Sequence, residues 1–94
     1  MVLRFGGRSG LVTGAAGGGV GFATAHRLRS EGARVAVIDR HEERTSEAVE
    51  RLAGEFGQSR VAGFVTDLAD RDALGHWLPE VERFLGPIDL LVNN

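Results

Sequence analysis

The residues with the clearest chemical potential are glycines gathered in one short segment. Eight of the fourteen glycines lie between positions 6 and 21, and residues 13–21 read Thr-Gly-Ala-Ala-Gly-Gly-Gly-Val-Gly. Glycine allows sharp turns and lets a ligand approach main-chain N–H groups, because it has no Cβ. Where such a loop opens a helix, the free N–H groups and the helix dipole attract phosphate. We therefore expect a pyrophosphate site, since a bare strand-to-helix turn needs only one or two glycines.

Two other phosphate-binding patterns do not fit this glycine-rich loop. Gly14 and Gly19 have the spacing of a P-loop, but Val20 occupies its lysine position and the chain contains no lysine. The G-x-G-x-x-G pattern also fails, because Thr24 stands where its last glycine is required. Any phosphate at this loop must therefore be held mainly by backbone donors.

An acidic residue follows the second apolar run of the chain. Asp39 comes directly after residues 34–38, eighteen positions beyond Gly21. A carboxylate there accepts a hydrogen bond from the ribose 2′-hydroxyl of NAD and repels the 2′-phosphate of NADP. The neighbouring Arg40 could receive that phosphate, and an aspartate that only caps a turn is the structural alternative. The direct charge argument favours NAD over NADP.

Missing residue types exclude several chemistries. The chain has no cysteine, so it has no disulfide, thiol nucleophile or zinc–cysteine site. It also has no tyrosine, and all eleven basic residues are arginine, so a tyrosine–lysine pair cannot form. His26, His41 and His76 lack metal-ligand spacing and are expected on the surface. The net charge of −2, with both signs interspersed, gives no basic stripe for nucleic acid.

The elements that must position these residues follow from four apolar runs alternating with three helical patterns. The runs are 11–13, 34–38, 61–65 and 88–92. Their near-continuous apolar character indicates strands buried on both faces of a parallel sheet. Right-handed crossovers then predict an α/β, Rossmann-like βαβαβαβ fold with strand order 3-2-1-4, part of a doubly wound sheet. A ligand is expected at the switch point between strands one and four.

The helical patterns carry their own signals for packing and termination. The second has an apolar stripe of Ala48, Val49, Leu52 and Phe56, and the third has one of Leu74, Trp77, Leu78, Val81, Phe84 and Leu85. Gly57 and the pair Gly86-Pro87 are expected to end these helices. Asp67 or Asp70 is expected to cap the third helix. Pro79 predicts a kink or break near Leu78.

Four segments together resemble one family. The loop Thr13–Gly21 resembles the T-G-x-x-x-G-x-G loop of the short-chain dehydrogenase/reductase family, with one extra residue before Gly19. Residues 32–40 resemble its second strand and the terminal acid that holds the adenine-side ribose. Asp67-Leu68 resembles its adenine-contacting pair, and residues 86–94 resemble the lead into its N-N-A-G motif. The resemblance implies the N-terminal, cofactor-binding half of such an enzyme.

The resemblance also implies a function and a set of site residues. Family members transfer hydride between a nicotinamide cofactor and an alcohol or carbonyl substrate. The expected cofactor is NAD, with NADP as the less favoured choice. For Asn93 a frayed, solvated end is the structural alternative. The expected cofactor-binding residues are Thr13, Gly14, Gly18, Gly19, Val20, Gly21, Asp39, Arg40, Asp67, Leu68 and Asn93.

The family's catalytic serine, tyrosine and lysine come from the second half of its fold. Here tyrosine and lysine are absent, and no serine, whether Ser9, Ser30, Ser46 or Ser59, matches the catalytic position. We therefore expect no catalytic residue, and cofactor binding without turnover. The alternatives are a fragment of a working oxidoreductase and a non-enzymatic binding or assembly module.

The expected organisation is a single dinucleotide-binding domain over residues 1–94, truncated after the fourth strand. An unpaired apolar edge at residues 90–92 predicts a homo-oligomer or pairing with a second polypeptide. Residues 9–25 are uncharged and could be mistaken for a signal peptide, but six of these seventeen are glycine. We therefore expect a cytoplasmic protein with no membrane partner.

Overall fold

The computed structural model describes residues 4–15 and 19–93. Its elements in chain order are β1 (Ser9–Thr13), α1 (Val20–Ser30), β2 (Arg34–Asp39), α2 (Glu42–Phe56), β3 (Val61–Val65), α3 (Leu74–Leu85) and β4 (Leu90–Val92). The four strands form one parallel sheet in the order β3-β2-β1-β4. The predicted α/β, Rossmann-like topology is confirmed.

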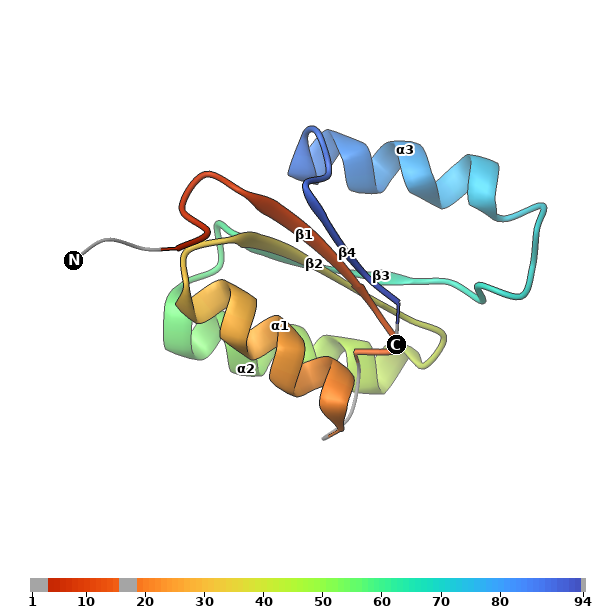
Figure 1. Ribbon diagram of the computed structural model, residues 1–94. Coiled ribbons are helices and arrows are strands. Elements are labelled where there is room, and N and C mark those ends of the chain that lie inside the picture. Colours follow the sequence, from red (N-terminus) through yellow and green to blue (C-terminus); the bar gives the residue numbers. More distant parts are fainter. Residues whose placement is uncertain (1–3, 16–18, 94) are drawn as a thin grey trace.

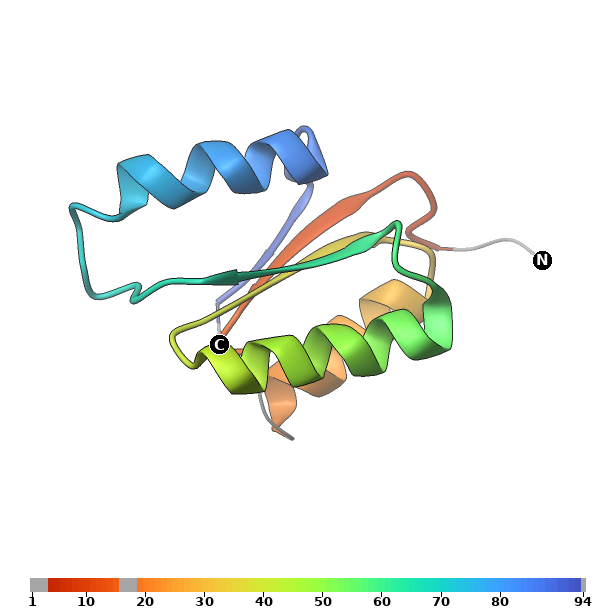
Figure 2. The same ribbon diagram turned by 180° about the vertical axis from the view of Figure 1, so that it is seen from behind.

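Helices cover both faces of the sheet. Helices α1 and α2 lie on one face and α3 on the other, as Figure 1 and the reverse view in Figure 2 show. Alternate residues of a strand serve the two faces: Val35 and Val37 pack in the cluster with α1 and α2. Ala36 and Ile38 instead pack in the cluster with α3. Burial on both faces explains why the two central strands, β1 and β2, are continuously apolar.

The helices end where the sequence predicts. In α2 the predicted stripe faces the sheet, with Ala48 and Leu52 buried and with Val49 and Phe56 packed beside them. The helix ends at Gly57, whose φ is 91°. Helix α3 likewise ends at Gly86, with φ 70°. Both glycines adopt positive φ, which residues with a Cβ rarely do.

The predicted break near Leu78 is wrong. Helix α3 runs without interruption from Leu74 to Leu85, with Pro79 inside it. Proline has no N–H, so only the one helical hydrogen bond from position 79 to the carbonyl of Gly75 is lost. Val81 and Leu85 are buried against the sheet and hold the following turn in place. Tertiary packing therefore outweighs the local cost of the proline.

The predicted caps of α3 are also wrong. The helix begins after Ala73 and has no hydrogen bond from a capping side chain. Asp67 Oδ1 accepts a hydrogen bond from the N–H of Ala69 at 2.9 Å, and Asp70 Oδ1 accepts one from Asp72 at 3.0 Å. Each carboxylate thus bonds the backbone two residues ahead, as aspartate does in turns. These aspartates shape the loop between β3 and α3.

Two strand boundaries differ from the predicted ones. Strand β1 begins at Ser9, two residues before the predicted start, and β4 begins at Leu90, two residues after it. Hydrogen bonds around Ser9 explain both shifts. The N–H of Ser9 donates to Asp89 Oδ2, and the carbonyl of Ser9 accepts from the N–H of Asp89, both at 3.0 Å. The Ser9 hydroxyl donates to the carbonyl of Leu85 at 2.6 Å.

Two glycines in neighbouring elements predict opposite effects of the same substitution. A Cβ on Gly63 of β3 would lie 2.7 Å from Val49 Cγ2 and 2.8 Å from Thr45 Cγ2. Both neighbours are β-branched residues with stiff rotamers on α2. We expect Gly63→Ala to lower the free energy of unfolding by about 1–3 kcal/mol through overpacking.

The matched control is Gly54→Ala in α2. A Cβ at Gly54 meets no atom within 4 Å, so alanine should stabilise the exposed helix by about 0.5–1 kcal/mol. Urea unfolding followed by circular dichroism measures both changes. Equal effects of the two substitutions would contradict the close packing of β3 against α2.

Candidate functional site

A cavity of about 380 Å³ lies where the strands end. This volume falls within the range of sites for small molecules. Because the strands are parallel, segments that are distant in sequence meet at this edge. The cavity is lined by Gly14, Asp39, Arg40, His41, Arg44, Thr66, Asp67 and Leu68.

The turn after β1 depends on Gly14. This residue has φ 60°, and its N–H donates to the carbonyl of Ile38 at 2.8 Å. The bond fixes the exit of β1 against the end of β2. A residue with a Cβ would be strained at this φ, so glycine is required here by the protein's own geometry.

Helix α1 follows the loop after the carboxyl end of β1 and begins with a glycine. Gly19 is the N-cap residue, has φ −90° and makes no side-chain capping bond. A Cβ there would meet no atom within 4 Å, so packing does not demand glycine. No acidic residue occupies the first turn. This arrangement fits a phosphate at the first N–H groups of the helix. Gly18 lies outside the described residues.

Asp39 joins the end of β2 to the start of α2. Its Oδ1 accepts a hydrogen bond from the N–H of His41 at 3.1 Å, and its carbonyl accepts one from Thr66 at 3.0 Å. The turn-capping role considered from the sequence is therefore present. A carboxylate offers about four acceptor sites, so this bond is compatible with accepting ribose hydroxyls from the adjoining cavity.

The cavity combines both signs of charge. Arg40 and Arg44 line it together with Asp39 and Asp67. The lining also includes Arg44, His41 and Thr66, which are not among the site residues predicted from the sequence. Arg44 lies in the first turn of α2, whereas Arg40 precedes the N-cap residue His41, so helical spacing does not relate the two arginines.

The loop after β3 contributes an acid and an apolar side chain. The Asp67 carboxylate bonds within its own turn, whereas Leu68 remains 46% exposed. Both residues line the cavity. An exposed leucine beside polar groups offers an apolar surface for a flat ring, while nearby polar groups can orient it.

The remaining sequence-predicted residues lie outside this cavity lining. Thr13 is buried, and its hydroxyl oxygen lies 3.3 Å from two acceptors that compete for its single proton, the Val92 carbonyl oxygen and Asn93 Oδ1. It therefore ties β1 to β4. In α1, Gly21 is buried and Val20 is 75% exposed. The structure thus assembles one cavity and places the start of α1 and the end of β4 outside its lining.

Within the described ranges, no three histidine or acidic residues are grouped so that they could hold a metal ion. No helix in the same ranges is long and apolar enough to cross a membrane.

Comparison with known proteins supplies an independent observation. The family model described as short chain dehydrogenase matches residues 9–94. The chain is 39% identical over 87 residues to 2,3-dihydro-2,3-dihydroxybenzoate dehydrogenase of Bacillus subtilis, covering 93% of this chain and 32% of that protein. It is 36% identical over 92 residues to meso-2,3-butanediol dehydrogenase of Serratia marcescens, covering 98% of this chain and 35% of that protein. The chain therefore spans about a third of these relatives.

Solved structures agree with the sequence relatives. A short chain dehydrogenase from Mycobacterium smegmatis superimposes with a TM-score of 0.88 at 38% identity, covering all of this chain and 38% of that one. L-sorbose reductase from Gluconobacter frateurii, complexed with NADPH and L-sorbose, gives a TM-score of 0.86 at 30% identity. The match covers 100% of this chain and 35% of that one.

The Thr13 hydroxyl predicts a measurable contribution to stability. We expect Thr13→Val to lower the free energy of unfolding by about 1 kcal/mol, because the partly buried Val92 carbonyl loses a donor. The matched control is Thr24→Val, whose exposed hydroxyl bonds only the carbonyl of Val20 within α1. That change should stay within about 0.5 kcal/mol. Chemical denaturation measures both, and equal losses would contradict the β1–β4 tie.

Proposed function

The chain belongs to the short-chain dehydrogenase family, which binds nicotinamide cofactors, and we propose that it forms the dinucleotide-binding portion of an oxidoreductase. The observation that carries this proposal is that α1, with its glycine N-cap, follows the carboxyl end of β1 while Asp39 lies at the carboxyl end of the neighbouring β2. One feature is suited to a pyrophosphate and the other to a ribose.

The residues have distinct roles in this proposal. The backbone N–H groups at Gly19, Val20 and Gly21 hold the pyrophosphate, and Gly14 keeps the preceding turn close. Asp39 accepts from the adenine-side ribose, while Asp67 and Leu68 border the adenine. Thr13 and Asn93 orient the strand ends. When bound, the nicotinamide supplies the hydride acceptor or donor for an alcohol or carbonyl substrate.

We propose NAD as the preferred cofactor. The Asp39 carboxylate at the end of β2 would lie beside the 2′-position and repel a phosphate there. Arg40 and Arg44 line the same cavity and would attract that phosphate. Asp39 is bonded to the His41 N–H, whereas exposed arginine side chains are flexible and screened by solvent. The carboxylate therefore dominates the choice.

A second function rests on a different feature of the sheet. Leu91 in β4 is 67% exposed, and among the described residues β4 pairs with β1 alone. A binding or assembly module would use this edge to pair with a second copy or another polypeptide. Partner binding that survives Gly19→Asp and Asp39→Ala would favour this function over cofactor binding.

Replacing the Asp39 carboxylate tests the proposed cofactor. We expect Asp39→Asn to weaken NAD binding by roughly 10- to 100-fold, because a hydrogen bond to a charged group contributes about 1.5–3 kcal/mol. Binding of NADP should strengthen, because the repulsion is removed. Titrations monitored by nicotinamide fluorescence of the reduced cofactors give both dissociation constants.

The matched control for this test is Asp72→Asn, in the exposed loop before α3. It makes the same change of charge and should leave both affinities within about twofold, because distant exposed charges are screened. Parallel losses in the two variants, or undiminished NAD binding in Asp39→Asn, would contradict the proposed ribose contact.

The absent catalytic residues predict binding without turnover for these 94 residues. No tyrosine or lysine is present to move a proton during hydride transfer. We expect the reduced cofactor to bind while its absorbance stays constant in the presence of short-chain ketones and aldehydes. Cofactor oxidation above the protein-free rate would contradict this prediction. Loss of that oxidation on Gly19→Asp would assign it to the proposed site.

A further inference from the structure

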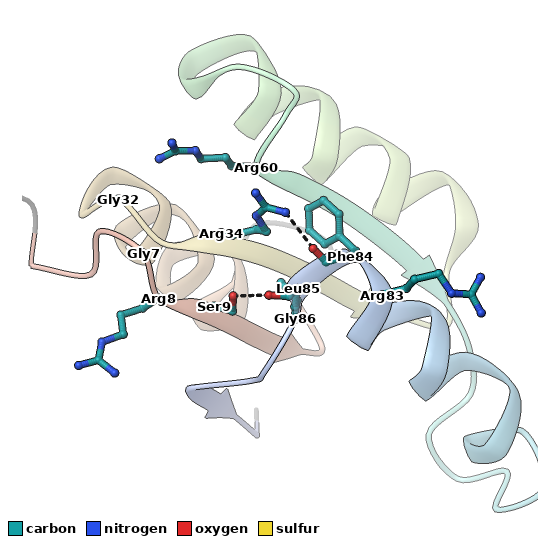
Figure 3. Close-up of a pocket in the computed structure, with 10 residues that line it drawn as sticks. All are labelled: Gly7, Arg8, Ser9, Gly32, Arg34, Arg60, Arg83, Phe84, Leu85 and Gly86. Carbon is teal, nitrogen blue, oxygen red and sulfur yellow. Dashed lines mark hydrogen bonds between the residues drawn. The ribbon is translucent and has the colours of Figure 1, made fainter.

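A second concave region lies at the opposite edge of the sheet, where the strands begin. It is a groove of about 460 Å³ between the amino ends of β1 and β2 and the last turn of α3 (Figure 3). Four arginines and Phe84 line it, together with small or buried residues. Parallel strands separate it from the dinucleotide cavity, which lies at their carboxyl ends.

The groove gathers positive charge in a chain whose net charge is −2. Arg8 precedes β1, Arg34 begins β2, Arg60 precedes β3 and Arg83 lies in α3. No acidic residue lines the groove. These arginines come from four separate segments, so the accumulation is produced by the fold. Concave sites lined by one sign of charge concentrate ions of the opposite sign.

Arg34 is held in place at the groove. Its Nη1 donates to the carbonyl of Phe84 at 3.0 Å, and its guanidinium carbon lies 5.5 Å from the centre of that ring. The hydrogen bond occupies one of five guanidinium N–H groups. The side chain is therefore oriented while further donors stay available for an anion.

The other three arginines surround this oriented residue. In Figure 3 the guanidinium groups of Arg8, Arg60 and Arg83 point outward and away from one another. Arg8 lies 3.6 Å from Asp89, but its side chain is 62% exposed, and such exposed pairs are weak. Like charges separate when nothing neutralises them, so a bound anion would draw these side chains inward.

The charge of Arg60 also acts on a neighbouring helix. Burial, and secondly the positive charge of Arg60, lower the pKa of Arg29 in α1 below its usual range. The positive charge of Arg60 therefore reaches a second arginine outside the groove.

We propose that this groove is a second ligand site, for a small molecule that carries more than one phosphate group. Guanidinium groups match phosphate oxygens in bidentate geometry, and several arginines around one groove suit a multivalent anion. The volume is within the range of small-molecule sites. The four large, exposed hydrophobic side chains of the described residues, at positions 20, 65, 68 and 91, do not line it. The groove therefore lacks anchors for a membrane surface.

Inorganic tripolyphosphate is the probe for this proposal. Isothermal titration calorimetry of the protein at low ionic strength should show saturable binding. The double variant Arg60→Gln/Arg83→Gln removes two rim charges and should weaken binding by about tenfold or more. Its matched control, Arg4→Gln/Arg71→Gln, makes the same change of net charge at exposed positions outside the groove. The control should change affinity by less than about twofold.

Three results would overturn the proposal. Equal weakening in the two double variants would show diffuse attraction to surface charge. If Gly19→Asp abolishes tripolyphosphate binding while Arg60→Gln/Arg83→Gln leaves that binding unchanged, the tripolyphosphate binds at the start of α1 and not in the groove. Binding of vesicles containing anionic lipid or of an oligonucleotide, without any response to tripolyphosphate, would exclude a small-molecule ligand. NAD binding should persist in Arg60→Gln/Arg83→Gln, because the two sites lie at opposite edges of the sheet.

Discussion

All four strands run in the same direction, and hydrogen bonds join β1 to β2 on one side and to β4 on the other. Parallel pairing brings every carboxyl end to one edge of the sheet and every amino end to the other. The chain must return across the sheet between strands, which it does through helices on both faces. The two concave regions arise at these edges. The cavity around Asp39 is formed by the ends of strands and the start of α2, whereas the arginine groove is formed by the beginnings of strands and the end of α3.

Close packing determines how accurately the carboxyl edge is built. The centre of β2 is buried on both faces, so a shift of register would move its side chains into the wrong layer. Glycines mark places where backbone geometry or space is limiting. Gly63 lets α2 approach β3, and Gly14 lets the chain leave β1 in a left-handed conformation. These local requirements place Asp39 beside the loop after β3, which supports the proposed ribose contact.

Much of the fold was predictable because it depends on patterns that survive in sequence. Apolar runs of strand length, helical stripes and the terminating Gly57 and Gly86 were located correctly. The two errors in α3 have different causes, one tertiary and one local. Pro79 does not break α3, because buried residues beyond it hold the helix on the sheet. Asp67 does not cap that helix, because its carboxylate bonds the nearer N–H of Ala69.

The sequence by itself determined the order of the strands, the family and the chemical types available for a cofactor site. These depend on hydrophobic spacing and on motifs read within short segments. Only the tertiary structure decided which residues share a cavity, because this depends on where helix α2 begins and how β2 and β3 align. It placed Arg44 and Thr66 beside Asp39. It also brought together arginines from four segments at the amino ends of the strands. No local pattern in the sequence shows that juxtaposition, since folding alone makes those distant positions neighbours.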